Sequence, residues 1–384
     1  MSEIDSSLKQ HSLALTEIIR QRIAQDNNIS FAEFMNMALY QPGLGYYSSG
    51  THKFGKEGDF VTSPELGDLF AKCMAQQFKQ IIQLLESPII MELGAGTGQF
   101  CFDCLIELNR LNCMPEQYFI LEVSADLKHR QQQKIKTLPL HIQQLVVWIN
   151  QPPVDEYKGI IFANEVLDAL AVEAFNYDGQ RYNQLRVSND SFTESGFKKH
   201  WLPFTSELEK QLISKQLNLS ANFQSEFIPH LSEWIRTISG NLTQGSIIFV
   251  DYGYERSSYY HSQRNQGTLV CHFQHQANFD YFNNIGIQDI TAFVDFTAVA
   301  EAADDCRLSV EGYSTQAHFL MSLEVHNKLG DSENDYEAYY RKTTEMKKLT
   351  MPNEMGEKFK VIALGKNFEE ELSGFSFSNQ LHLL

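Results

Sequence analysis

Three glycines at alternate positions follow a short apolar run in the segment MELGAGTGQF, residues 91–100. They are Gly94, Gly96 and Gly98, and Glu92 precedes them. Glycine tolerates the positive-φ backbone of a tight turn and lets the chain approach a bound ligand closely. The segment therefore predicts a turn between a strand and a helix that holds a cofactor.

The spacing of the glycines discriminates between cofactors. The dinucleotide fingerprint G-x-G-x-x-G would place its third glycine at position 99, which is Gln99. A phosphate-binding P-loop ends in Gly-Lys-Ser or Gly-Lys-Thr, and no such triplet follows. The pattern E-x-G-x-G-x-G instead resembles motif I of class I S-adenosylmethionine (SAM)-dependent methyltransferases. The residues predicted to bind SAM here are Glu92, Gly94, Ala95, Gly96 and Gly98.

Two later apolar runs end in polar residues that suit the same cofactor. Glu122 ends the run YFILE, and a carboxylate there can accept hydrogen bonds from both ribose hydroxyls. Asn164 and Glu165 end the run GIIFANE, and open α/β sheets bind ligands at the carboxyl ends of their strands. We predict that Glu122 and Asn164 bind the cofactor. An ordinary helix start is the alternative for the second site.

Short apolar runs alternate with helical segments through the middle of the chain. This rhythm is typical of a parallel sheet covered on both faces. The predicted fold class is α/β, a class I methyltransferase (Rossmann-like) sheet with an N-terminal helical covering segment and a hairpin/helical insertion. The predicted strands are 89–93, 118–123, 145–149, 159–165, 245–253 and 358–364.

The domain organisation is predicted from changes in composition. Residues 1–86 form an N-terminal helical segment with a cofactor- or substrate-covering loop, because glycine and proline are frequent at 40–65 and Ser63-Pro64 opens a helix to about Leu85. An alternating pattern around Asp178-Gly179 indicates a hairpin. The core is assigned to 87–175 and 241–366, an insertion or lid to 176–240, and a tail to 367–384.

Bulk composition limits the partners and the compartment. The net charge of −17 opposes nucleic acid, whose binding relies on Lys and Arg, and the neutral interpretation is solubility. No run reaches the roughly 20 apolar residues of a membrane span. The six cysteines suggest no disulfide framework and the first arginine is Arg20, so we predict a cytoplasmic protein without a transit peptide.

Ordered sequence blocks from about residue 40 to 366 resemble one family. The chain is similar to the MidA-type proteins, whose mitochondrial relatives are protein-arginine methyltransferases that assist respiratory complex I assembly. One departure is Ala171, where the family usually has proline after DAL, and this change could alter the acceptor pocket. The blocks are QPGLGYY, FGKEGDFVTSPELGDLF, MELGAGTGQF, LEVSADLKHRQ, NEVLDAL, VDYG, GTLVCHFQH, DITAFVDFTAVAEAA and MGEKFKVIALGK.

The resemblance implies SAM as cofactor and a protein acceptor, with arginine of a respiratory complex I-type subunit as the family-level expectation. It also implies that the GDF.TSPE block shapes the site. Carried onto this chain, the predicted cofactor-binding residues of the block are Gly58, Phe60, Thr62, Ser63 and Pro64, and its acids are Asp59 and Glu65.

An arginine acceptor would require carboxylates, since guanidinium stays charged and its lone pairs are delocalised. A base must also accept the proton that leaves as the new bond forms. Our hypothesis is that Asp59 and Glu165 flank the acceptor, with Glu65 and Asp168 as lesser candidates. A surface acid or a helix cap is the alternative for each.

Aromatic and histidine residues supply three further candidates for the acceptor site. Tyr46 and Tyr47 are predicted to line the acceptor path through cation–π contacts, with structural packing as the alternative. His275, in CHFQH, is predicted to act in the pocket or to make a structural hydrogen bond. We interpret Asp289 and Asp295 as helix caps, and we expect no metal site.

Two other functions stay open on the sequence alone. A non-catalytic assembly factor or chaperone could retain the SAM fold, and a small-molecule methyltransferase could enclose its acceptor under the covering segment. The expected partners are a protein substrate and possible homodimer formation, with no nucleic acid and no membrane span.

Overall fold

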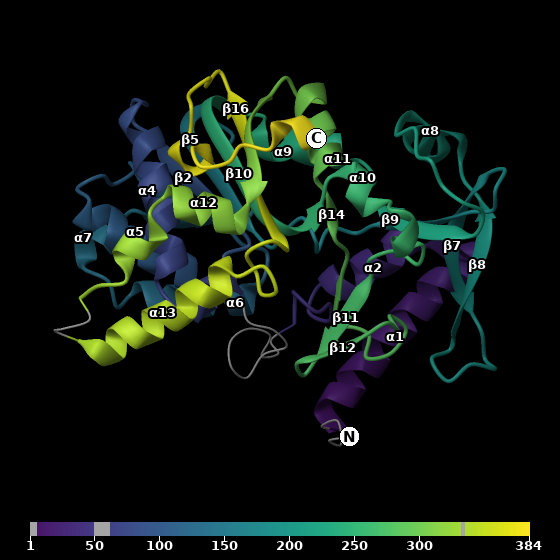
Figure 1. Cartoon of the computed structure of the whole chain (residues 1–384). Helices are drawn as coiled ribbons and strands as arrows, with labels where there is room; N and C mark the ends of the chain where they lie inside the picture. Colours follow the sequence, from purple (N-terminus) through teal and green to yellow (C-terminus); the bar gives the residue numbers. More distant parts are fainter. Residues whose placement is uncertain (1–5, 50–61, 332–334) are drawn as a thin grey trace. The chain divides into compact units, whose positions relative to one another are not determined.

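The computed structural model describes residues 6–49, 62–331 and 335–384. Its contacts divide the chain into two compact units (Figure 1). The first unit comprises Met1–Phe60, Asp168–His230 and Arg256–Asp295, and the second comprises Val61–Leu167, Leu231–Glu255 and Phe296–Leu384. The first unit thus joins the amino-terminal segment to the predicted insertion and to residues that we had assigned to the core.

The second unit is built on a mixed sheet with a parallel centre. Its strands follow the order β15-β16-β10-β5-β2-β3-β4, in which β10, β5, β2, β3 and β4 pair in parallel and β16 pairs antiparallel with both β10 and β15. The α/β prediction is therefore confirmed, with one antiparallel strand, β16, between β15 and β10. The strand bounds are β2 Ile89–Leu93, β3 Gln117–Leu121, β4 Val146–Ile149, β5 Tyr157–Asn164, β10 Leu242–Tyr254, β15 Ser309–Thr315 and β16 Phe359–Lys366.

Helices cover both faces of this sheet, because successive side chains of a strand point to opposite faces. Ile248 and Val250 of β10 belong to the cluster that includes α4 and α5, whereas Phe249 packs on Trp234 of α9 at 5.9 Å between ring centroids. The helix bounds are α3 Ser63–Leu66, α4 Leu69–Gln83, α5 Gln99–Arg110, α6 Ala125–Ile135, α7 Leu140–Gln143, α9 Leu231–Ser239, α11 Phe296–Asp305, α12 Gln316–Ser322 and α13 Tyr336–Thr350.

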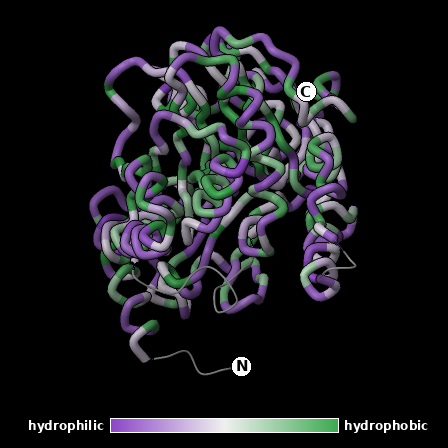
Figure 2. Tube along the Cα trace, turned by 90° about the vertical axis from the view of Figure 1, so that its left-hand side faces the viewer, coloured by the Kyte–Doolittle hydropathy of each residue, from purple (hydrophilic) through white to green (hydrophobic). Residues whose placement is uncertain are grey.

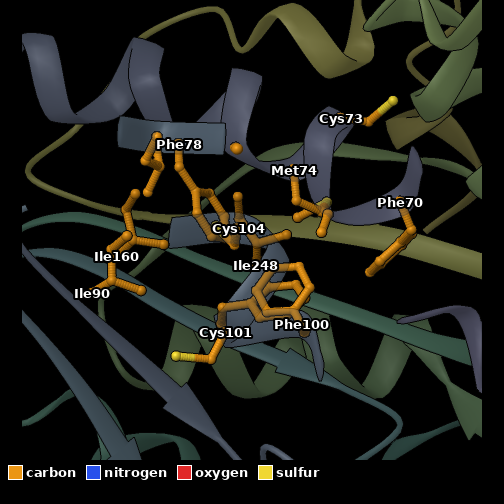
Figure 3. Packing of buried hydrophobic residues seen from close by; sticks show 14 of the residues in the cluster. Phe70, Cys73, Met74, Phe78, Ile90, Phe100, Cys101, Cys104, Ile160 and Ile248 are labelled. Carbon is orange, nitrogen blue, oxygen red and sulfur yellow. The ribbon is translucent and has the colours of Figure 1, made fainter. Parts of the chain in front are cut away.

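Aromatic rings and two thiols fill the space between the sheet, α4 and α5 (Figure 3). Phe100 stacks on Phe162 with centroids 4.3 Å apart, and Phe78 meets Phe162 edge-on at 5.5 Å. Cys101 and Cys104 are fully buried in this cluster, and burial raises the pKa of both thiols well above the usual value. All five residues of β2 are buried, and Figure 2 shows hydrophobic stretches of the trace in the interior, with hydrophilic ones at the periphery. These cysteines are packing residues.

Two predictions about the second unit are wrong in detail. The helix predicted from Ser63 to about Leu85 is split into α3 and α4, because Gly67 is extended and the Glu345 carboxylate occupies the space that a side chain at Gly67 would need. Glu345 accepts a hydrogen bond from the Leu69 amide at 2.7 Å. The segment predicted to be a tail instead contributes three residues to the core cluster, Phe368, Leu372 and Phe375.

The first unit contains two antiparallel sheets packed with aromatic residues. One has the order β1-β7-β6-β9 with β8 paired to β7, and the other has the order β12-β11-β13. The predicted hairpin is present, since Tyr177 pairs with Tyr182 across the Asp178-Gly179 turn. The bounds are α1 Ser6–Asp26, β1 Ile29–Ser30, α2 Phe31–Tyr40, β6 Glu173–Tyr177, β7 Tyr182–Asn189, β8 Phe197–Pro203, α8 Ser206–Ser214, β9 Phe223–Phe227, α10 Arg256–Tyr259, β11 Val270–Phe273, β12 Gln276–Asn278 and β13 Asp289–Thr291.

The core of the first unit lies under α1 and α2. Phe34 meets Phe282 edge-on at 5.3 Å and Phe197 at 6.0 Å, and Leu15, Ile19 and Ile23 of α1 are buried in the same cluster. Ser30 caps α2 by accepting from the Glu33 amide at 3.1 Å. Within the described residues, no helix has both the length and the apolar character needed to cross a membrane.

Candidate cofactor site and acceptor residues

The glycine turn has the backbone that its sequence predicts. Gly94, Gly96 and Gly98 have φ values of +63°, +53° and +77°, which favour glycine over residues with a side chain. The Gly94 amide donates to the Leu121 carbonyl of β3 at 3.2 Å, and the Gly98 amide closes the turn on the Ala95 carbonyl at 2.7 Å. The turn is therefore fixed to the neighbouring strand before α5 begins.

The surroundings of the three glycines differ. A methyl group at Gly94 would lie 3.1 Å from Cγ2 of Val166, and one at Gly98 would lie 3.1 Å from Cγ of Gln131. A methyl group at Gly96 would meet no described atom of the chain within 4 Å. Gly94 and Gly98 thus allow close packing, while Gly96 borders space that a ligand can fill. The turn fits a cofactor that touches backbone.

Glu122 lies beside the turn, at the end of the adjacent parallel strand. β2 and β3 pair in register, with Leu93 opposite Leu121, so the residues after each strand are neighbours. The Glu122 carboxylate is buried, and it accepts from the Ser124 amide at 2.8 Å and from Nε2 of Gln131 at 2.9 Å. These donors hold a carboxylate oxygen acceptor next to the turn, which fits the predicted binding of ribose hydroxyls.

Gln131 is a residue of this site that the sequence argument missed. Its Nε2 also donates to the Gly96 carbonyl at 2.9 Å, and its Oε1 accepts from the Trp148 indole at 2.9 Å. A signal was present, because Leu127, Gln131 and Ile135 share the buried face of α6. A glutamine in the middle of an apolar helix face must find partners for its amide.

Glu92 lies under the turn, in the interior. Its carboxyl accepts from the Tyr118 hydroxyl at 2.7 Å, and burial raises the pKa of Glu92 to about 8 against the opposing effect of that hydrogen bond. The group is therefore mostly protonated at pH 7. A direct contact of Glu92 with the cofactor stays a prediction, as do the other assigned roles.

The end of β5 forms a strained turn that Asp251 supports. Glu165 has φ of +54°, unfavourable for a residue with a side chain, and its amide donates to the Val250 carbonyl at 2.9 Å. Buried Asp251, in β10, accepts from the amides of Val166 and Leu167 at 3.2 and 2.9 Å. The block VDYG was noticed in the sequence, but this positioning role of its aspartate was not.

Asn164 provides a buried acceptor atom at the end of β5. Its Nδ2 donates to Oε1 of Glu165 at 3.1 Å, whereas its Oδ1 is buried without a hydrogen-bond partner among the described residues. A buried acceptor without a donor is costly, and a donor on a bound ligand would remove that cost. Asn164 and the Gly96 space both favour an occupant at this edge of the sheet.

The TSPE segment contacts the glycine turn directly. Thr97, between Gly96 and Gly98, donates its hydroxyl hydrogen to Oε1 of Glu65. Ser63 is buried and donates to Oε1 of Gln316 at 3.2 Å, and Pro64 is buried beside it. Thr62 is the residue that precedes α3. The predicted site residues Gly58, Asp59 and Phe60 lie outside the described residues.

The acceptor candidates Tyr46, Tyr47, Asp168 and His275 all belong to the first unit. The Tyr47 hydroxyl donates to both carboxylate oxygens of Asp289, at 3.0 and 2.9 Å. Burial, with the charges of Asp289 and Asp168, raises the pKa of Tyr47 well above its usual value. Tyr47 is therefore a neutral donor to a buried acid.

The three remaining acceptor candidates of the first unit, Tyr46, Asp168 and His275, have different surroundings. Tyr46 is buried against Tyr47, with centroids 5.0 Å apart, and Asp168 is buried with its carbonyl accepting from the Ala292 amide at 3.1 Å. His275 is exposed in the β11–β12 turn with φ of +61°. The interpretation of Asp289 as a helix cap is wrong, because it lies in β13.

Asp295 directly precedes α11, which is the position expected of a helix cap, and it also forms ion pairs. Its carboxylate pairs with Arg256 at 3.4 Å and with Lys215 at 3.8 Å. Two cations beside one largely buried carboxylate hold α10 and the residue after α8 near β14, Val294–Asp295. The cap interpretation fails for Asp289 alone, because the sequence does not reveal that its partner is Tyr47.

Comparisons with known proteins identify the family of the chain. A family model described as putative S-adenosyl-L-methionine-dependent methyltransferase matches residues 69–314. A relative from Caenorhabditis elegans, named protein arginine methyltransferase NDUFAF7 homolog, mitochondrial, is 27% identical and covers 82% of this chain and 77% of its own. The human protein of that name is 26% identical and covers 89% and 81%.

A solved structure is similar over its whole length. A likely methyl transferase from Burkholderia thailandensis, crystallised with S-adenosyl-homocysteine, is 32% identical with a TM-score of 0.94, and each chain is covered completely. A native crystal structure from the same organism gives a TM-score of 0.91 at 32% identity. These two structures support the predicted fold class over the whole chain.

The comparisons also correct one prediction. The cytoplasmic location is wrong, because the relatives from Caenorhabditis elegans, rat and human are all named mitochondrial proteins. Net charge and cysteine number relate to solubility and to the redox state of the compartment. They do not distinguish one reducing compartment from another. The prediction from the glycine spacing is confirmed by the family model: this chain belongs to the family of putative SAM-dependent methyltransferases, and the resemblance to the MidA-type proteins holds.

Proposed function

We propose that the protein transfers a methyl group from SAM to an arginine side chain of another protein, with a subunit of a respiratory complex I-type enzyme as the acceptor. The observation that carries the proposal is the name shared by its relatives. Proteins from Caenorhabditis elegans, rat and human that cover 82%, 92% and 89% of this chain are each named protein arginine methyltransferase. The complex I-type acceptor comes from the resemblance to the MidA-type proteins.

The second unit supplies residues that fit the cofactor. The backbone of Gly94, Gly96 and Gly98 would border it, Glu122 would accept from its ribose hydroxyls, and Oδ1 of Asn164 would take a donor from it. SAM, when bound, supplies a methyl group on a sulfonium, which makes that methyl electrophilic. The role of the protein is then to orient the acceptor nitrogen in line and to exclude water.

Methylation of guanidinium releases one proton. As the nitrogen–carbon bond forms and the sulfur–carbon bond breaks, the product guanidinium keeps its charge and the proton passes to a base. Glu165 is our first candidate, because its strained backbone at the end of β5 is fixed by Asp251. Glu65 is a second candidate, next to Thr97. Asp59 remains part of the proposal from the resemblance alone.

The acceptor side of the proposal involves the first unit. Aromatic rings hold guanidinium on their faces, and carboxylates bind it through paired hydrogen bonds. Tyr47 stacks on Tyr40 with centroids 5.5 Å apart, and its hydroxyl is bonded to Asp289. We assign Tyr46, Tyr47, Asp168 and His275 to acceptor recognition on this basis and on the resemblance.

The proposal also includes association of the protein as a homodimer. Light scattering would measure the mass of the protein in solution and so test this association.

One experiment tests the proposal directly. The protein is incubated with methyl-labelled SAM and lysate from a strain that lacks it, and the labelled band is digested and sequenced. Label on an arginine of one protein supports the proposal. Label in a small molecule, or tight SAM binding with no transfer to any protein, contradicts it and favours a small-molecule methyltransferase or a non-catalytic assembly factor.

A further inference from the structure

Gln131 connects the glycine turn after β2 with Glu122, the residue after β3. Its single amide nitrogen donates to the Gly96 carbonyl and to Oε2 of Glu122, both at 2.9 Å. Gly96 belongs to the turn after β2, and Glu122 follows β3. A bound nucleoside must touch both features at once, so the distance between them determines how well it fits.

The orientation of the Gln131 amide is fixed by its partners. A primary amide has two N–H donors, and both are used, while its oxygen accepts from Nε1 of Trp148 at 2.9 Å. Rotation of the amide by half a turn would place its oxygen against two acceptors and its nitrogen against the indole donor. Because Gln131 is fully buried, water cannot replace these bonds.

Gly98 allows Gln131 to lie this close. A methyl group at Gly98 would be 3.1 Å from Cγ of Gln131 and 3.4 Å from both its Cα and its Cβ. The contact with Cγ is tighter than usual, so the Gln131 side chain would have to give by a few tenths of an ångström, and the positive φ of Gly98 adds strain. The third glycine of the motif therefore suits the close approach of Gln131, while Gly96 borders open space.

The geometry points to Gln131 as a positioning residue that sets the Glu122 carboxylate against the glycine turn and thereby controls the affinity for the adenosine portion of the cofactor. This role rests on SAM as the cofactor and is independent of the acceptor. A glutamate here would lose the donated hydrogens and place a second carboxyl beside Glu122. Two carboxylates that share a site retain one proton to a higher pH.

The other ionisable groups near Gln131 either hold a proton at pH 7 or have a hydrogen-bond or ion-pair partner of their own. On β2, Glu92 is mostly protonated at pH 7, and on α6 the Lys134 amine donates to Gln99 at 2.6 Å. On α5, Asp103 accepts from that same Gln99 at 2.6 Å. On the outer side of α6, Arg130 pairs with Asp126 at 2.9 Å. A new pH dependence in a Gln131→Glu variant would therefore report the pair formed with Glu122.

Calorimetry with S-adenosylhomocysteine on the full-length protein tests this role. We expect Gln131→Glu to weaken binding about 30-fold at pH 8 and only about threefold at pH 5.5, where the shared proton restores one hydrogen bond. Gln131→Ala should weaken binding about tenfold at both pH values. The control is Gln133→Glu, the same substitution at an exposed position two residues further along α6.

The possible outcomes separate this role from a structural one. Equal pH dependence in Gln131→Glu and Gln133→Glu, with the wild type binding normally, would overturn the assignment of Gln131 and leave the cofactor assignment intact. A lower melting temperature of Gln131→Glu with unchanged affinity would also overturn it. Absence of binding by the wild type would overturn both assignments.

Discussion

The glycine turn of the second unit and the Tyr47–Asp289 pair of the first unit differ in how the chain assembles them. The turn, Glu122 and Gln131 come from one continuous stretch, residues 92–131, in which strand, turn and helix follow each other. Tyr47 and Asp289 are separated by 242 positions, and Asp168 lies between them in sequence. The first arrangement is specified by local patterns, and the second only by the folded first unit.

The two regions also use different physical means. The turn uses positive-φ glycines and backbone hydrogen bonds, which create space beside a fixed carboxylate. The Tyr47–Asp289 pair uses desolvated side chains, in which a neutral hydroxyl compensates a buried acid. We therefore expect changes near the turn to affect cofactor affinity or turnover, and changes at the pair to affect acceptor affinity or the stability of the first unit.

The largest effect is expected from Glu165→Gln. If Glu165 accepts the acceptor proton, its loss should lower kcat about 100-fold or more, with SAM affinity nearly unchanged. The control is Glu324→Gln, since Glu324 is an exposed glutamate with a similar φ of +55°. Methyl-transfer kinetics measure both variants, and full turnover by Glu165→Gln would remove this residue from the proposed chemistry.

Gly96→Ala should abolish most cofactor binding with little change in the fold. The added methyl meets no described atom of the chain, so only the positive φ is penalised, by about 1 kcal/mol. The same methyl would occupy space assigned to the cofactor, and S-adenosylhomocysteine affinity should fall about 100-fold.

Gly330→Ala is the matched control for that change. Gly330 has φ of +88° and equally open surroundings, so its thermal stability should fall by a similar amount while calorimetry shows normal binding. Equal affinities of the Gly96 and Gly330 variants would show that the space beside Gly96 does not hold the cofactor.

The difference between the regions explains what the sequence could predict. The parallel strands, the glycine turn and the Glu122 position follow from periodicity and spacing within about 40 residues. Asp251 and Asp289 could not be assigned, because each acts on a segment distant in sequence: Asp251 on the amides after β5, and Asp289 on Tyr47. Burial of Phe375 in the core is equally non-local.

The division of the chain into two units could not be predicted from local sequence patterns either. β1, β7, β6 and β9 pair residues 29–30 with residues 173–227, so the amino-terminal segment and the predicted insertion share one sheet. Alternation of apolar residues predicts a strand but does not identify the strand with which it pairs. The sequence therefore predicts the hairpin at Asp178-Gly179 but not the pairing of β1 with β7.

Tyr47→Phe should affect the first unit and leave the cofactor site unchanged. Removal of the hydroxyl leaves Asp289 without its 2.9 and 3.0 Å hydrogen bonds, which should destabilise the first unit by about 1–3 kcal/mol. We expect KM for the protein acceptor to rise about tenfold and S-adenosylhomocysteine affinity to stay unchanged.

The control for Tyr47→Phe is Tyr182→Phe, whose hydroxyl has no hydrogen bond to any described residue and whose ring packs on Phe175 at 5.7 Å. Methyl-transfer kinetics at varied acceptor concentration measure KM for the acceptor, and calorimetry with S-adenosylhomocysteine measures the affinity of the cofactor site. A Tyr47→Phe variant with weakened cofactor binding and normal acceptor KM would reverse the roles assigned to the two regions.

The smallest effect should come from Glu92→Gln and should appear as pH-dependent stability. Because burial raises the pKa of Glu92 to about 8, the folded protein keeps a proton that the unfolded chain releases near pH 4.5. The stability contributed by this group is complete below about pH 4.5 and is lost as the pH rises to about 8, with a slope of up to about 1.4 kcal/mol per pH unit. The neutral amide can still accept from Tyr118, so Glu92→Gln should gain stability relative to the wild type across this range.

Urea unfolding at pH 5, 6.5 and 8 would measure the difference, with Glu116→Gln as an exposed control that should follow the wild type. Because every other titrating group is common to the variant and the wild type, the difference between their curves isolates residue 92. Parallel curves would mean that Glu92 is ionised in the folded protein and faces the ligand side of the turn. In that case Glu92→Gln should instead weaken S-adenosylhomocysteine binding, and Glu92 would join Glu122 as a charged part of the cofactor site.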